Sequence, residues 1–184
     1  KFDLEVTLEY AASLDEGEMS ANAYYDQEAE LEGDPPIHIE LIFSNKDKKG
    51  MDMDTEGFDE LSKQVAKVVV HELLHKSQAN ARNFIEKKPF KVKNVSMPQQ
   101  AKSQQYLGDS DEIEAYGHNI AVDLLRNYGS QRNALTALKN FIRIGPDKSP
   151  DMYAYLIAFG MDKNHPVLKK LIKKIILYLR ELDK

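Results

Sequence analysis

The chain has 184 residues, 42% of them hydrophobic and 30% charged, and its formal net charge at pH 7 is −5. This composition is typical of a globular domain with its own core, and the acidic balance disfavours general binding to nucleic acid. The absence of cysteine excludes disulfides, thiolate zinc ligands and cysteine nucleophiles. No apolar run approaches the roughly 20 residues that span a bilayer, so no membrane span is expected.

The N-terminal part of the sequence predicts strands. Residues 2–10 (FDLEVTLEY) and 37–43 (IHIELIF) alternate between apolar and other side chains, a period of two that is typical of strands with one buried face. The acidic, polar segment 11–34 between them is predicted as a loop that includes at most a short helix around Met19 to Ala29.

The rest of the sequence predicts helices. From residue 55 the apolar period changes to three and four, which indicates a helix up to about residue 81. A long loop is expected over 87–108, and the next helix begins at Asp109 or Ser110 and ends at Gly129. Three further helices are predicted at 131–144, 150–159 and 166–182. The fold class is therefore α+β, with strands at the front and mostly helix behind.

The segment KVVVHELLHKSQ (67–78) carries the clearest chemistry. On a helix, His71 and His75 lie one above the other on the same face, so both imidazoles can bind one Zn²⁺ at about 2 Å. Glu72 is rotated by about 100° from His71, which directs its carboxylate to a metal-bound water rather than to the metal. There it can act as the general base for attack on a carbonyl. A core helix that contains histidines by chance is the alternative.

A zinc site of this kind needs a third protein ligand. After His75 the chain reads KSQANARN, which contains no further histidine, so a carboxylate from elsewhere is expected. The helix from Asp109 is the obvious source, because it carries four acids: Asp109, Asp111, Glu112 and Glu114. The helix dipole favours acids in the first turn, which accounts for part of this cluster. It accounts least well for the acid at position 114, because Glu114 lies beyond the first turn.

HELLH followed by DEIEAYGHNIAVDLL resembles the zincin metallopeptidases that use a glutamate as third ligand, both thermolysin-like enzymes and the ImmA/IrrE-type family. Alignment with the second helix of that family places the third ligand on Glu114, beside Ala115. Tyr116 stands where the family prefers asparagine, and His118 occupies a bracing position that is a carboxylate in thermolysin-like enzymes. The two segments also resemble small HExxH proteins encoded by tailed phages.

This resemblance implies a zincin-like fold, in which a small mixed sheet lies behind the HExxH helix and its edge strand pairs with an extended substrate. Residues 37–43 are then either that edge strand or an ordinary core strand. The chain is predicted as one metallopeptidase-like domain over 1–184. Within it, 1–54 is the sheet-rich part, 55–128 holds the metal-site helices and 129–184 is the helical C-terminal part.

The expected function is hydrolysis of peptide bonds in a protein or peptide substrate, with Zn²⁺ as cofactor and Glu72 as the catalytic base. His118, Tyr106 and Tyr116 are candidates for stabilising the oxyanion or supporting the ligands, although tyrosines also pack in cores. A soluble protein, cytoplasmic or associated with a virion, is expected. One alternative is a non-catalytic zinc-binding structural or regulatory protein with the same fold, for example a virion component.

A second alternative is a helical binding module that uses the basic C-terminal helix. The last helix carries a run of cations, namely Lys169, Lys170, Lys173, Lys174 and Arg180. The ordinary interpretation of this run is the solvated face of an amphipathic helix, and the other is binding of a membrane or an anionic partner.

Overall fold

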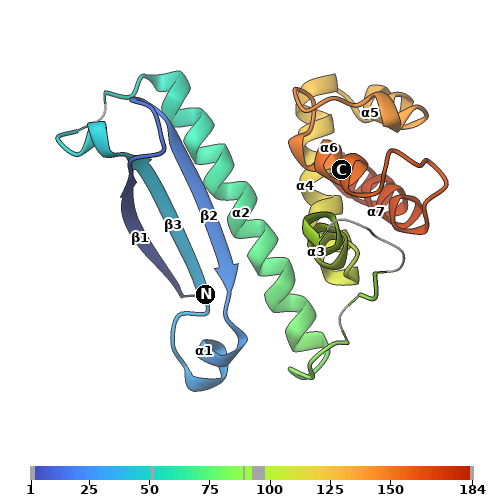
Figure 1. Ribbon diagram of the computed structural model, residues 1–184, viewed down its shortest axis with the longest axis horizontal. Coiled ribbons are helices and arrows are strands. Elements are labelled where there is room, and N and C mark those ends of the chain that lie inside the picture. Colours follow the sequence, from blue (N-terminus) through green and yellow to red (C-terminus); the bar gives the residue numbers. More distant parts are fainter. Residues whose placement is uncertain (1–2, 51, 89, 93–97, 183–184) are drawn as a thin grey trace. The chain divides into compact units, whose positions relative to one another are not determined.

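The structure is a computed structural model that describes residues 3–50, 52–88, 90–92 and 98–182. The chain forms two compact units, Lys1–Ile85 and Glu86–Lys184. The first unit contains β1 (Leu4–Ala11), β2 (Met19–Tyr25), α1 (Gln27–Glu32), β3 (Ile37–Ser44) and α2 (Thr55–Ala81). The second contains α3 (Pro98–Leu107), α4 (Ser110–Tyr128), α5 (Gln131–Leu138), α6 (Pro150–Ala158) and α7 (Pro166–Leu182) (Figure 1). The α+β class with a mainly helical C-terminal half is confirmed, and the prediction of a single domain stays a prediction.

The three strands form a mixed sheet in the order β1-β3-β2. β3 pairs in parallel with β1, with Leu4 opposite Ile37, and antiparallel with β2, with Tyr25 opposite Ile37. β3 is therefore the central strand, and Ile37 and Ile39 on it are buried. The interpretation of this segment as an edge strand is wrong, because both of its edges are hydrogen-bonded; the alternative of a core strand is confirmed.

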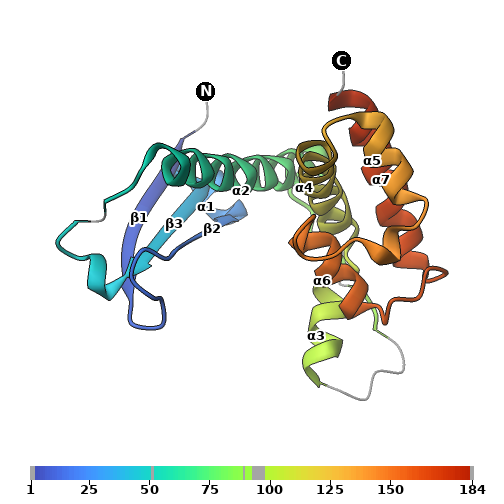
Figure 2. The ribbon, with the colours of Figure 1, turned by 90° about the horizontal axis from the view of Figure 1, so that it is seen from above.

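The predicted strand at the N-terminus exists, but its expected burial is wrong. The apolar side chains of β1 alternate as expected, yet 39% to 62% of their surface is exposed in Leu4, Val6, Leu8 and Tyr10. The reason is the placement of α2, which packs against the sheet mainly through β2 and less through β3 (Figures 1 and 2). Phe2, the first residue of the predicted strand, lies outside the described residues.

Two segments predicted as loops contain regular structure. Residues 11–34 hold β2 and α1, and α1 begins at the N-cap Asp26, whose side chain accepts hydrogen bonds from two backbone amides, and ends at Gly33 with a φ of 88°. The predicted loop 87–108 contains α3, a polar helix of ten residues that begins at Pro98. β2 depends on pairing with β3, which lies further along the chain, so local periodicity could not reveal it.

An ion pair attaches α2 to the rest of the first unit. Lys76 on α2 donates to Glu30 of α1, and the Tyr25 hydroxyl donates to the same carboxylate at 2.5 Å. Burial acts to raise the pKa of Glu30, but the hydrogen bonds from Lys76 and Tyr25 outweigh it and hold that pKa below its ordinary value. Both paired side chains are mostly buried, so this contact ties α2 to α1.

The second unit is built on α4 and α7, which pack against each other. They approach closely at Gly117, where an added Cβ would lie 2.8 Å from the Lys174 Cβ. The predicted helix signals are confirmed: Asp109 caps α4, Gly129 ends it with a φ of 71°, and Ser149 caps α6. The predicted helix 131–144 is shorter, because α5 ends at Leu138 and a short 3₁₀ turn follows at Phe141–Arg143. No helix within the described ranges is both long and apolar enough to cross a membrane.

Candidate metal centre

The HELLH segment lies on α2 as predicted. Asp54 caps the helix, and its 27 residues run without interruption through the motif. His71 and Glu72 are buried, with 6% and 7% of their surface exposed, and they are the buried polar residues that α2 contributes. His75 is half-buried one turn later. Burying polar groups of this kind is costly unless they have partners. Buried ionisable side chains on a helix are therefore more typical of a functional position than of an ordinary core helix.

The two histidines meet as the helical spacing requires. Their ring centroids are 4.8 Å apart and the rings are inclined by 75°. Nδ1 of His75 lies 3.0 Å from the side-chain carbonyl Oε1 of Gln78. Because a carbonyl oxygen only accepts, Nδ1 of His75 donates, and Nε2 keeps its lone pair for a metal ion. The sequence signal for this contact is the spacing of three between His75 and Gln78, which brings the two side chains together on a helix.

In the second unit, Glu112 lies in the first turn of α4 among tyrosines. Tyr106 is hydrogen-bonded to Tyr116 and to Glu112. The pKa of Tyr106 is raised far above its ordinary value, mainly by burial and further by the nearby charges and by these hydrogen bonds. Tyr116 also contacts Tyr155 edge-on, with ring centroids 5.7 Å apart. Tyr155 is fully buried, and burial is the largest cause that raises the pKa of its hydroxyl. The charge of Glu112 is the next largest cause. Within this group the Tyr106 hydroxyl is hydrogen-bonded to the Glu112 carboxylate, and such a contact orients a carboxylate.

Glu114 and His118 lie on the side of α4 that meets α7. Lys174 donates to the Glu114 carboxylate at 2.8 Å, and the Tyr178 hydroxyl donates to the same oxygen at 3.4 Å. His118 meets the Tyr178 ring edge-on, with centroids 5.2 Å apart. These contacts give Glu114 a role in joining α4 to α7, so the sequence-based choice of Glu114 as third ligand has a competitor in Glu112.

The remaining histidines have local contacts. His38 lies 3.1 Å from the Glu5 carboxylate and stacks on Tyr24 across the sheet. His165 accepts a hydrogen bond from the backbone of Val167 and packs against the Phe159 ring. Of the candidate ligands, His71 and His75 belong to the first unit, and the carboxylates of Glu112 and Glu114 belong to the second.

Comparisons with protein-family models, with curated proteins and with solved structures find no match to this chain. The resemblance to zincins consequently rests on the HELLH segment and the acidic helix alone.

Proposed function

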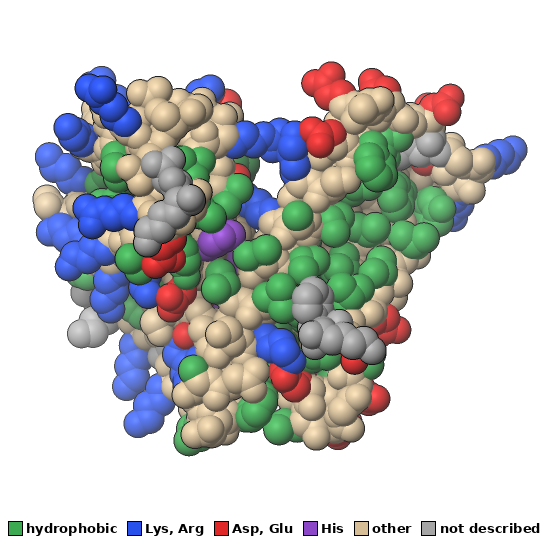
Figure 3. All heavy atoms as spheres, turned by 180° about the vertical axis from the view of Figure 1, so that it is seen from behind, with side chains coloured by type: hydrophobic (Ala, Val, Ile, Leu, Met, Phe, Trp, Pro, Cys, Tyr) green, Lys and Arg blue, Asp and Glu red, His purple; other side chains and the backbone are tan. Residues whose placement is uncertain are grey.

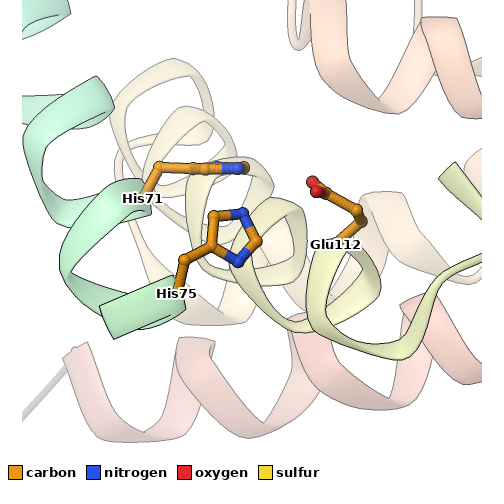
Figure 4. Close-up of side chains that lie close together, drawn as sticks. All are labelled: His71, His75 and Glu112. Atoms are coloured by element: carbon orange, nitrogen blue, oxygen red, sulfur yellow. The ribbon is translucent and has the colours of Figure 1, made fainter. Parts of the chain in front are cut away.

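We propose that His71, His75 and Glu112 hold one Zn²⁺ ion in a peptidase site. The observation that carries the proposal is the position of His71 and His75 on one face of α2, with ring centroids 4.8 Å apart, which suits a shared ion (Figure 4). We assign the carboxylate to Glu112 because Lys174 and Tyr178 already hold Glu114. Two imidazoles and one carboxylate form a ligand set of catalytic zinc sites, in which the fourth position is left for water.

The donor set fits the metal chemically. The hydrogen bond to Gln78 leaves Nε2 of His75 available, and the Tyr106 hydroxyl supports the Glu112 carboxylate. Such outer contacts fix the orientation of ligands and raise their affinity for the ion. Both imidazoles and the carboxylate suit zinc, and the absence of cysteine and methionine from the set disfavours softer metals.

Glu72 is the proposed general base. Glu72 follows His71 directly on α2, so the two side chains leave the helix about 100° apart. This spacing suits a carboxylate that contacts a metal-bound water beside His71 and not the metal itself. Bound zinc lowers the pKa of such a water and polarises a carbonyl group. Glu72 accepts the proton of the attacking water and returns it to the leaving amine, which gives net hydrolysis of a peptide bond.

The sheet supplies a surface for an extended peptide. β2 is an edge strand, and it is the strand against which α2 mainly packs. An unpaired strand edge beside the motif helix can hydrogen-bond a peptide backbone by strand addition. The edge-strand role that the sequence suggested for residues 37–43 is thus proposed for β2.

The test joins metal content with activity. We expect purified wild-type protein to contain about one zinc per chain by mass spectrometry and to cleave members of an unbiased peptide library. The double variant His71→Ala, His75→Ala should lose both properties, while His38→Ala, which changes a histidine outside the group, should keep both. Full zinc occupancy without cleavage of any peptide would instead support the alternative, a structural or regulatory zinc protein.

A further inference from the structure

α7 carries a second stripe beside the one that it buries. Its buried residues are Val167, Leu168, Leu171, Ile175 and Leu179. The adjacent stripe recurs at intervals of three and four, so its side chains share one face of the helix. It consists of Lys170, Lys173, Lys174, Leu177 and Arg180. A solvated helix face would not need Leu177 among its cations, and 45% of this leucine is exposed.

Leu177 lines a pocket between α7 and the start of α4. The pocket has a volume of about 440 Å³, and its apolar wall consists of Ile113 from α4 together with Ile176 and Leu177 from α7. Four cations of the stripe also line it, and Ser110 completes it. Figure 3 shows lysine and arginine side chains gathered on the second unit. A volume of this size is in the range of small-molecule sites, which usually join apolar walls with a few polar groups.

The charges of most cations around this pocket are not neutralised by an acid among the described residues. Lys174 is paired with Glu114, but Lys170, Lys173 and Arg180 form no ion pair with an acid in the described part of the chain. This local excess stands in a protein whose formal net charge is −5. The pocket is therefore complementary to a negative group placed beside an apolar one.

We propose that this pocket binds a small amphipathic carboxylate, with its alkyl chain against Ile113 and Leu177 and its carboxylate beside Lys173 and Arg180. A peptide fits less well, because its backbone needs hydrogen-bond partners and Ser110 is the one uncharged polar side chain among the described residues that line the pocket. The second unit, in its described part, also contains no strand edge that could pair with a peptide backbone. A membrane surface fits less well too, because the main apolar stripe of α7 is already buried in the core.

The experiment titrates decanoate into the full-length protein below its micelle-forming concentration and measures binding by calorimetry. Acetate and decanol serve as probes for the head group and the chain alone. We expect decanoate to bind, each fragment probe to bind at least tenfold more weakly, and affinity to fall as salt concentration rises. Lys173→Glu and Leu177→Asp should each weaken decanoate about threefold to tenfold, given the small energies of exposed charge pairs. Lys169→Glu, an exposed lysine of α7 outside the pocket, should change little.

Three results would overturn the proposal. They are absence of decanoate binding, equal affinity for decanol, and equal affinity in Leu177→Asp and the wild type. A sedimentation arm with vesicles of anionic phospholipid distinguishes a membrane as the source of the anion. Retention on vesicles that Leu177→Asp abolishes, without binding of free decanoate, would assign the surface to lipid and reject the small ligand. Circular dichroism of each variant shows whether the fold is intact.

Discussion

Gln78 orients His75: its side-chain carbonyl lies 3.0 Å from Nδ1 of the imidazole, one turn further along the same helix. We expect Gln78→Leu to weaken zinc binding by about 10- to 100-fold, because loss of an outer hydrogen bond frees the ring and its tautomer. Competition with a chromogenic chelator measures this affinity. Ser77→Ala, at the exposed neighbouring position, is the matched control and should bind zinc as the wild type does.

The outcome that would contradict this role is an unchanged zinc affinity in Gln78→Leu. In that case His75 would be oriented by other contacts, and the hydrogen bond would serve the helix surface alone. Helical content should be the same in both variants, since leucine and glutamine have similar helix propensities.

The choice of third ligand is tested by a pair of matched variants. Glu112 and Glu114 are two residues apart on α4, about 200° around the helix, so both cannot face one metal ion. Glu112→Gln should lose most of its zinc. Glu114→Gln should keep zinc and lose no more than about 1 kcal/mol of stability, because its partly exposed pair with Lys174 is weak. The reverse pattern of zinc content would restore Glu114 as the ligand.

The contact between Lys76, Glu30 and Tyr25 predicts a pH dependence of stability. The pKa of Glu30 is lowered in the folded protein, so its contribution is complete above the unfolded-state value of about 4.3. It is lost as the pH falls through the folded-state pKa. Urea unfolding should show that Glu30→Gln costs roughly 1.5–3 kcal/mol near pH 7, and that the cost shrinks as the pH falls below about 4. A cost independent of pH would mean that the charge of Glu30 contributes nothing.

The sequence revealed those parts of the fold that local patterns determine. α2 has its predicted bounds, 55–81, because apolar spacing and the Asp54 cap act within a few turns of the chain. The sequence did not predict β2, because this strand is stabilised by pairing with β3. It did not predict α3 either, because the sequence of α3 is polar and has little periodicity. The exposure of β1 depends on where α2 packs, which no local pattern contains.

The candidate site divides in the same way. Helical spacing alone predicted that His71 and His75 would meet, and their rings do. The competition between Glu112 and Glu114 depends on which neighbours each carboxylate finds. Lys174 and Tyr178 reach Glu114 from α7, 60 and 64 residues away, whereas Tyr106 reaches Glu112 from α3. Tyr155, which is fully buried near Glu112, carried no signal in the sequence beyond its apolar surroundings.

Glu72 should be required for turnover but not for metal binding or folding. Glu72→Gln keeps the shape of the side chain and its hydrogen-bonding capacity, but an amide cannot accept the proton of the attacking water. Loss of a general base commonly costs ~10²–10⁴ in rate, or about 3 to 5 kcal/mol on the barrier. Stability should change little or rise, because the change removes a charge from a side chain that is only 7% exposed. Peptide cleavage and zinc content, measured side by side for the wild type and Glu72→Gln, check this. Equal cleavage by a fully zinc-loaded variant would show that another group is the base.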